Sequence, residues 1–570
     1  MEPQAATGDI PADPAAAGLP VRAALTGSPS PAPAAGNAVE AYKAAIGGDG
    51  LAVREQLPGI LARGYEALTP AEKELLKWVG VFFRKPTPGR FMMRIRMANG
   101  LATAAQFRAI AELSTRLGNS VVDITTRQQI ELRGFTFESI PEIWEKLRGV
   151  DLHSLQTGID NVRNINGCPL AGLTPHELFD ASPIVREIDA RMVGRDGNPE
   201  FTNLPRKFNI TVTGCLENCT HAESQDIALV PATRRGRAGF NVLVGGKMGS
   251  GGMTVASPLD VFVEPGEAAG VVVELVRIYR DHGPRGARAK CRFAFLLEAW
   301  GVARLRAELS TRLNRELPRQ GTDQRRPVHA DHLGFIEQKQ SALFAIGLCV
   351  PTGRVNPRQM QEIARLAEEY GDGRIRLTTG QNAILPNVPA RRLRQLLAEP
   401  LLEEFSPAPS PFFRRMVACV GTDYCNLALI ETKQRAVELS RALDARLGTT
   451  GKPLSIHWSG CPAGCGNHQA ADIGFRGFKT KINGELVDAV AIYTGGRTGP
   501  NAAPGVEIAE MVPCDEKFAE RVADVVREYR RTREERVPER RKVAPRVPAA
   551  QRNLGIGEPP AAAPASAGAD

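Results

Sequence analysis

An internal duplication constrains this chain of 570 residues more strongly than any other feature. The sequence MANG at 97–100 has its counterpart in VPTG at 350–353, and TTRQ at 125–128 has its counterpart in TTGQ at 378–381, each at an offset of 253. A later part repeats at an offset of 246, which carries the motif GC-x3-C at 214–219 onto 460–465. The chain is therefore predicted to fold as two related α+β halves. A binding site of such a molecule is expected at the interface between the halves.

Both copies carry apolar residues with the spacing of an amphipathic helix. These residues are Phe107, Ile110, Leu113 and Leu117 in the first copy, and Met360, Ile363, Leu366 and Tyr370 in the second. Each copy is predicted to form a strand, a helix, a strand and a helix. The predicted ranges are 91–97, 104–118, 121–133 and 139–150, then 342–350, 357–371, 375–387 and 390–400.

Four cysteines in the second half form two closely spaced pairs. Cys419 and Cys425 are separated by five residues, and Cys461 and Cys465 by three, with 35 residues between the pairs. Two thiol pairs can converge on one inorganic centre, and thiolates favour iron–sulfur clusters, zinc or copper(I). The spacing differs from the C-x2-C pairs of structural zinc sites. The alternative is a set of buried, inert cysteines.

The two halves differ in their metal ligands and in their cations. The first half has Cys168, Cys215 and Cys219 but no fourth cysteine between 168 and 215, so we expect these three thiols to be buried core residues rather than ligands of a second four-thiolate cluster. The alternative is a reactive or cross-linked thiol. Conversely, the first half has cations and an amide where the second has none. Arg94 and Arg127 correspond to glycines at 347 and 380, and Lys207 and Asn209 correspond to a proline and a serine at 453 and 455. One half is therefore predicted to hold a metal and the other an anion.

Bulk properties exclude several classes of protein. The N-terminus has no basic segment followed by an apolar run, and no apolar window approaches the roughly 18 residues of a membrane span, so we expect a cytoplasmic protein that does not insert into a membrane. The net charge of +9 is compatible with an anionic ligand or an acidic protein partner. No nucleic-acid-binding motif accompanies the charge, so nucleic-acid binding is not expected.

Several ordered motifs resemble the siroheme-containing nitrite/sulfite reductase family. They are KWVGVF at 77–82, GRFMMR at 89–94, TTRQ at 125–128, DNVRN at 160–164, LPRKFN at 204–209 and the two cysteine pairs. The resemblance covers roughly residues 50–535 and implies a pseudo-twofold fold of ferredoxin-like and cluster- and siroheme-binding subdomains.

The resemblance also implies domain boundaries. The expected order is a disordered Ala/Pro-rich tail at 1–40, a helical segment with the first ferredoxin-like half-domain at 41–155, a siroheme and substrate-side domain at 156–325, the second ferredoxin-like half-domain at 326–405, a [4Fe-4S] and siroheme domain at 406–542, and a disordered tail at 543–570.

By resemblance, the cysteine quartet binds a [4Fe-4S] cluster, and Cys465 is also the axial ligand of the siroheme iron. The substrate-side residues implied by the matching motifs are Arg94, Arg163, Lys207 and Asn209. Arg127 is expected to pair with siroheme carboxylates. Siroheme and nitrite are both anionic, and guanidinium groups offset such charge with directed hydrogen bonds.

The resemblance favours an assimilatory nitrite reductase that reduces nitrite to ammonia with six electrons. Sulfite-reducing members usually have Lys-x-Lys where this chain has Lys207-Phe208-Asn209, and sulfite carries more negative charge than nitrite. No dinucleotide-binding fingerprint follows a predicted strand, so reduced ferredoxin, or flavodoxin, is the expected donor to a monomeric enzyme. The alternatives are a sulfite reductase of the same fold, a corrin-biosynthesis enzyme of related architecture, and a noncatalytic iron–sulfur electron carrier or redox sensor.

Overall fold

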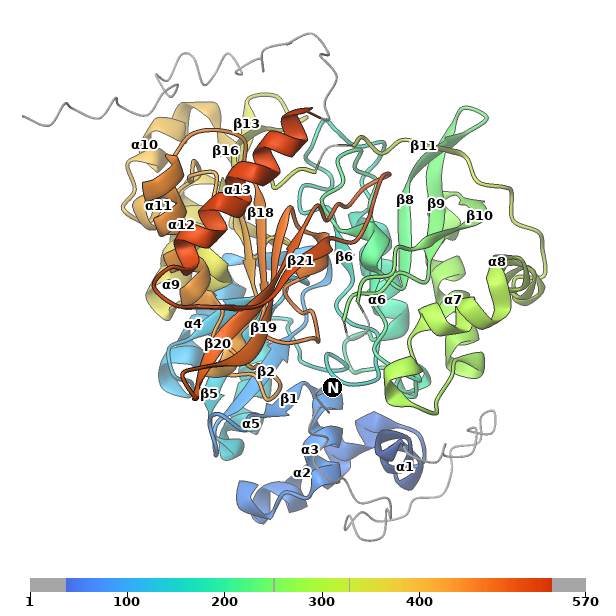
Figure 1. Ribbon diagram of the computed structural model, residues 1–570. Coiled ribbons are helices and arrows are strands. Elements are labelled where there is room, and N and C mark those ends of the chain that lie inside the picture. The colour runs from blue at the N-terminus through green and yellow to red at the C-terminus, as the bar shows by residue number, and fades with distance from the viewer. Residues whose placement is uncertain (1–36, 250–251, 328, 536–570) are drawn as a thin grey trace, which may run out of the picture.

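The computed structural model describes residues 37–249, 252–327 and 329–535, and its elements form two similar halves (Figure 1). The two terminal tails expected at 1–40 and 543–570 lie outside the described residues, apart from 37–40. Residues 38–40 do not belong to a tail, because they form the first turn of helix α1 (Ala38–Ala45). Helices α1, α2 (Val53–Ala62) and α3 (Pro70–Leu75) precede the first sheet.

Two sheets form the ferredoxin-like part of the molecule, and each contains an edge strand from the other half. The first sheet has the order β1 (Val81–Phe83), β2 (Phe91–Ile95), β5 (Ile130–Phe135), β4 (Val122–Ile124) and β14 (Arg354–Val355). The second has the order β12 (Gly334–Glu337), β13 (Leu343–Leu348), β16 (Ala383–Pro389), β15 (Arg374–Leu377) and β3 (Leu101–Thr103). Strand β14 pairs with β4 and strand β3 pairs with β15, both antiparallel, so the halves exchange their edge strands.

The duplicated helices begin in the same way and pack together. Helix α4 (Ala104–Arg116) begins with a capping box between Thr103 and Gln106, and α9 (Pro357–Tyr370) begins with the same arrangement between Asn356 and Gln359. The predicted apolar stripes face inward, because Phe107 and Ile110 of α4 and their counterparts in α9 are buried. The two helices pack against each other within one hydrophobic core that spans both ferredoxin-like sheets.

The other two sheets also repeat each other, strand for strand. One has the order β10 (Ser257–Val263), β9 (Arg237–Val244), β8 (Ile227–Arg234), β7 (Ile210–Val212) and β6 (Asn166–Gly167), with the short β11 (Thr322–Asp323) beside β8. The other has the order β17 (Arg415–Ala418), β18 (Ser455–Ser459), β19 (Ile473–Ile482), β20 (Glu485–Thr494) and β21 (Val506–Pro513). In each sheet the first three strands in chain order are parallel and the last two are antiparallel. The predicted duplicated α+β fold is confirmed.

Helices accompany each of these sheets in its own lobe (Figure 1). The remaining helices are α5 (Ile140–Gly149), α6 (Ser182–Met192), α7 (Ala268–His282), α8 (Phe293–Arg312), α10 (Leu393–Leu397), α11 (Leu401–Glu404), α12 (Lys433–Leu447) and α13 (Phe518–Glu535). Helices α6, α7 and α8 share a core with β7–β10, and α12 and α13 share a core with β17–β21. No helix in the described ranges is long and apolar enough to cross a bilayer.

The prediction of single strands at 121–133 and 375–387 is wrong, because each range contains two strands and a turn. In the first copy the turn lies between β4 and β5, and Gln128 takes a left-handed conformation with φ 54°. Gln381 repeats this in the second copy with φ 64°. The Gln128 side chain donates to the carbonyls of Gly167 and Leu377, both at 3.0 Å, so contacts with distant segments stabilise the turn. Arg127 projects from this turn rather than from a strand.

Candidate functional site

The four cysteines of the second half line one cavity of about 190 Å³. Cys419 directly follows β17, and the pair Cys461 and Cys465 follows the neighbouring parallel strand β18. Parallel strands end at the same edge of a sheet, so their following loops meet there. Gly464, between the cysteines of the second pair, has φ 66°, a conformation that L side chains rarely adopt. The sequence therefore brings the quartet together as predicted.

Backbone amides donate hydrogen bonds to two sulfurs of the quartet, and burial raises thiol pKa values. The amide of Gly460 donates to Cys419 Sγ at 3.1 Å, and the amide of Leu427 donates to Cys425 Sγ at 3.4 Å. Burial raises the pKa of Cys419 to about 11 and that of Cys461 to about 12. The thiols are therefore protonated at neutral pH without a metal, and metal binding releases their protons. Such N–H···S contacts are a known means of tuning iron–sulfur clusters.

Cys465 has a different environment from the other three cysteines. It is exposed, whereas Cys461 is buried and Cys419 and Cys425 are partly buried. It also lines a second, narrower space of about 30 Å³, together with Arg127, Lys207 and Asn209. Cys465 is thus the thiol that joins the cysteine cavity to the cationic space.

Neither Arg127 nor Lys207 makes an ion pair within the described part of the chain. Arg127 lines both cavities, and its guanidinium makes no hydrogen bond or ion pair with the residues that the structure describes. Lys207 is likewise unpaired within the described ranges, and burial, followed by the nearby arginines 292 and 127, holds its pKa well below the usual range. Burial also lowers the pKa of Arg127 to about 10. Uncompensated cations beside a cavity are arranged to receive an anion.

The backbone of Asn209 is held by a hydrogen bond, whereas its side-chain oxygen has no partner among the described residues. Its amide donates to Asp226 Oδ2 at 2.8 Å, and Arg292 in turn binds both oxygens of Asp226, at 3.1 and 2.7 Å. The Asn209 Oδ1 atom is buried and has no hydrogen-bond partner among the described residues. Asn166 lines the same space, and its Oδ1 atom is also buried without a hydrogen-bond partner among the described residues.

The other two predicted arginines lie together, but only one reaches the cysteine cavity. Arg94 lines that cavity, and its Nη1 donates to the carbonyl of Thr157 at 3.1 Å. Arg163 donates to the same carbonyl at 2.7 Å and to the carbonyl of Ile159 at 2.8 Å. Arg163 does not line either of the two cavities, and the Nε atom of its guanidinium has no partner in the described part of the chain.

Sequence reasoning missed two residues of the site. Arg84, directly after β1, lines the cysteine cavity with an unpartnered buried Nε, and burial lowers its pKa to about 10. Glu131 of β5 binds Arg94 and also lines the cavity. The signal for Glu131 is visible in the sequence, because Glu131 and Arg133 are charged residues in a strand whose other residues are apolar or glycine, and buried charges need partners of opposite charge. Arg84 has no such signal, since it lies between two recognised motifs.

The donor set fits a thiolate-bound cluster beside a polycarboxylate cofactor. The quartet supplies soft ligands, and the unpartnered buried polar atoms of Arg84, Asn166 and Asn209 belong to residues that line the same two cavities. Buried polar groups are normally hydrogen-bonded, so a ligand that satisfies them is expected at this place. A larger cavity of about 550 Å³ lies at the corresponding place of the repeat, where Thr378 and Gly380 replace Thr125 and Arg127. None of the four cysteines of the quartet lines it.

Comparisons with known proteins agree with this geometry. The family model described as "Nitrite and sulphite reductase 4Fe-4S domain" matches residues 158–317 and 410–544, and the model "Nitrite/Sulfite reductase ferredoxin-like half domain" matches residues 83–150 and 336–402. The chain is 44% identical over 475 residues to a ferredoxin–nitrite reductase of Synechococcus elongatus, an alignment that covers 82% of this chain and 92% of the relative.

Two further proteins extend the comparison. An assimilatory ferredoxin-dependent nitrite reductase of Haloferax mediterranei is 40% identical over 511 residues, covering 84% of this chain and 86% of that protein. The solved structure of the Mycobacterium tuberculosis NirA protein superimposes with a TM-score of 0.81 at 29% identity, covering 89% of this chain and 95% of that one. Matched in both of its repeated parts and across most of its length, the chain belongs to the nitrite and sulphite reductase family.

Proposed function

We infer that the protein is a ferredoxin-dependent assimilatory nitrite reductase. The reaction consumes nitrite, six electrons and eight protons, and it yields ammonium and two water molecules. The observation that carries the proposal is Cys465, which lies both in the cysteine cavity and in the cationic space with Lys207 and Asn209. The relatives named as ferredoxin–nitrite reductases support the same activity.

Two cofactors fit the residues present, namely a [4Fe-4S] cluster and siroheme. Cys419, Cys425, Cys461 and Cys465 would hold the cluster, and Cys465 would also be shared with the siroheme iron. Arg127 would pair with siroheme carboxylates, because its guanidinium has no other partner among the described residues. When bound, these cofactors supply the electrons and the iron at which nitrite is reduced.

The chain's own residues bind the anion and supply protons. Lys207 makes no ion pair with the described residues, and the low dielectric around it strengthens its attraction for nitrite. Because burial holds its pKa well below the usual range, its ammonium gives up a proton more readily than an exposed lysine does. Arg94, fixed by Glu131, is proposed as a permanent positive charge that orients the substrate.

Asn209 supports nitrite over sulfite as the substrate. Its neutral amide adds no charge to the space that Lys207 lines, which suits a monoanion better than a dianion. Electrons would come from reduced ferredoxin, an acidic protein that suits the net charge of +9, with flavodoxin as the alternative donor. We further propose that the enzyme is a monomer and that it works in the cytoplasm, where free thiols remain reduced.

Turnover and spectra of the purified holoenzyme test the proposal. With dithionite-reduced methyl viologen, we expect nitrite to be reduced to ammonium faster than sulfite is reduced. We expect Cys465→Ser to abolish this turnover and to change the visible spectrum, while Cys514→Ser, at a half-buried cysteine far from the quartet in sequence, leaves both unchanged. Faster turnover of sulfite would identify a sulfite reductase instead. A visible spectrum without porphyrinoid bands would support an iron–sulfur carrier.

A further inference from the structure

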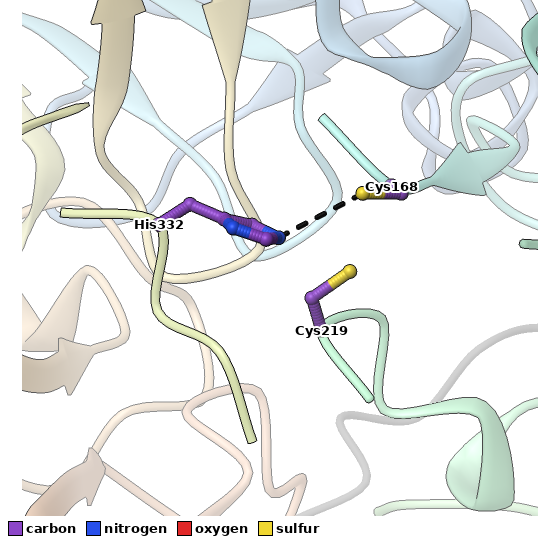
Figure 2. Close-up of side chains that lie close together, drawn as sticks. All are labelled: Cys168, Cys219 and His332. Carbon is purple, nitrogen blue, oxygen red and sulfur yellow. Dashed lines mark hydrogen bonds between the residues drawn. The ribbon is translucent and has the colours of Figure 1, made fainter. Parts of the chain in front are cut away.

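A second group of potential metal ligands lies in the first half, outside the site described above. The ligand atoms of Cys168, Cys219 and His332 all lie within 4.8 Å of one another. Figure 2 shows these three side chains close together. Cys168 Sγ and His332 Nε2 are 3.7 Å apart. Cys215 packs in the same buried cluster as Cys168 and Cys219, and all four residues are buried. Three free thiols and one imidazole therefore lie together in one buried region.

These cysteines occupy the places that the cluster ligands occupy in the other half. Cys168 directly follows β6 as Cys419 directly follows β17. Cys215 and Cys219 follow β7 at the positions of the C-x3-C pair that follows β18, at the offset of 246. The first half has no cysteine at the place of Cys425, so three of the four thiol positions are retained.

His332 reaches the thiols from the connection before β12, and several contacts fix it there. Its φ of 55° lies in the left-handed region, which histidine adopts more readily than most residues do. Gly347 makes this path possible, because a Cβ at 347 would lie only 1.9 Å from the His332 carbonyl oxygen. The preceding residue, Asp331, is held by ion pairs with Arg414 at 2.9 Å and Arg415 at 3.0 Å.

The separations among Cys168, Cys219 and His332 match one metal ion rather than a cluster. In a tetrahedral zinc site with Zn–S near 2.3 Å, two sulfurs are roughly 3.8 Å apart, and a sulfur and a nitrogen are roughly 3.6 Å apart. The 3.7 Å between Cys168 and His332 agrees with this. No three cysteines of the quartet, all of them among the described residues, form so compact a group. This is expected if their thiolates bind different irons of a cluster.

We propose that Cys168, Cys215, Cys219 and His332 bind one Zn²⁺ ion. The three thiols lose their protons to solvent when the ion binds, and the imidazole binds through Nε2 in its neutral form. Three thiolates and one divalent ion leave a net charge of −1. Arg376 provides the opposite charge, because its buried guanidinium donates to the carbonyls of Pro169 and Ala171, directly after Cys168.

The site has both an access route and a structural consequence. Cys219 and His332 line the cavity of about 550 Å³, through which an ion can enter. The carbonyl of Cys219 accepts a hydrogen bond from Thr379 at 2.8 Å, so its loop is also tied to the second ferredoxin-like half. The ion would join the loops after β6 and β7 to the connection that leads into β12. The ion would therefore link the sheet that contains β6 and β7 to the start of the second half.

Metal analysis of the holoenzyme, purified without chelators or a metal-affinity tag, tests the site. We expect about one zinc per chain in addition to the iron, as for a closed structural site. Cys219→Ser and His332→Ala should each lower the zinc content at least about tenfold, as expected when one of four ligands is lost. Cys349→Ser, at another buried cysteine, should leave it unchanged. Zinc far below one per chain in the wild type, or equal zinc in Cys219→Ser, would overturn the proposal.

X-ray absorption at the zinc edge gives a second test that needs no variant. We expect about three sulfur ligands at about 2.3 Å and one nitrogen at about 2.0–2.1 Å. A shell of oxygen and nitrogen alone would show adventitious surface zinc and would refute the site. Mass spectrometry of protein with blocked thiols gives a third test, because it detects disulfides. A disulfide between any two of the three cysteines in the purified enzyme would also contradict the zinc site.

Discussion

Arg94 donates from both Nε and Nη2 to the same carboxylate oxygen of Glu131, at 3.0 and 2.7 Å. The Arg94 guanidinium also lies over the Phe82 ring, 4.7 Å from its centroid. The arginine is therefore held in one orientation at the wall of the cysteine cavity before any anion arrives. A side chain ordered in advance loses little conformational freedom on binding, which improves affinity.

Removing the charge of Glu131 should weaken nitrite binding. In Glu131→Gln the Arg94 side chain loses its ion pair and is free to reorient. We expect KM for nitrite to rise about fivefold, which corresponds to about 1 kcal/mol, with a smaller change in kcat. Steady-state turnover with reduced methyl viologen measures both constants. Glu112→Gln, at an exposed glutamate paired with Arg116, is the matched control and should leave KM unchanged. An unaltered KM in Glu131→Gln would show that Arg94 needs no such support.

The same carboxylate should contribute a pH-dependent part of the stability. Burial alone would raise the pKa of Glu131, but Arg133, Arg94 and Arg84 lower it to about 2 from an ordinary value of 4.5. A lowered pKa contributes stability that is fully present above pH 4.5 and is lost as the pH falls towards 2. We therefore expect the difference in Tm between wild type and Glu131→Gln to shrink between pH 5 and pH 3. A difference that stays constant across this window would contradict the lowered pKa.

Arg127 should matter for cofactor content more than for folding. Its guanidinium is unpaired within the described ranges and partly desolvated, so Arg127→Gln removes an unfavourable charge from the empty protein. We expect the Tm of the cofactor-free protein to stay equal or to rise. The ratio of siroheme absorbance to protein should fall about twofold or more, as expected from the loss of one charge-assisted contact. Arg116→Gln on the surface of α4 is the control. Full siroheme content in Arg127→Gln would remove Arg127 from the cofactor site.

A single charge at position 209 should change the substrate preference. Asn209→Lys places a second cation beside Lys207, which favours sulfite, the more highly charged anion. We expect the ratio of kcat/KM for sulfite to that for nitrite to rise about tenfold, equivalent to about 1.4 kcal/mol. Asn209→Gln keeps the charge unchanged and should leave the ratio near its wild-type value. If both variants behave alike, charge at this position does not select the substrate.

The two duplicated helix caps should contribute similar amounts to the free energy of unfolding. Thr103 and Asn356 each accept a hydrogen bond from the backbone amide of a glutamine three residues later. We expect Thr103→Ala and Asn356→Ala each to lower the free energy of unfolding by about 1 kcal/mol. Thermal unfolding followed by circular dichroism would show the loss as a lower Tm. Thr311→Ala, on the exposed surface of α8, should have little effect.

Periodicity and spacing predicted the duplicated helices and the cysteine quartet from the sequence. The apolar stripe that contains Phe107 is a local pattern, so it can be recognised without knowledge of the tertiary structure. The quartet was predictable because two short spacings place thiols on loops at one sheet edge. The turn after β4 was not, because neither glycine nor asparagine stands at Gln128 to mark the left-handed residue.

His332 shows a second limit of sequence reasoning. It lies more than a hundred positions from Cys219, and nothing in its spacing from the cysteines indicates a shared site. Only the tertiary fold brings it to the thiols. The expectation that Cys168, Cys215 and Cys219 are buried is confirmed, but the approach of His332 to Cys168 and Cys219 could not be read from the spacing of the cysteines.

The exchange of β3 and β14 between the two ferredoxin-like sheets has a mechanical consequence. Each sheet is completed by a strand whose chain belongs to the opposite half, so neither half can swing away without breaking backbone hydrogen bonds in both sheets. A hinge between the two ferredoxin-like halves would therefore have to break both strand pairs before it could open.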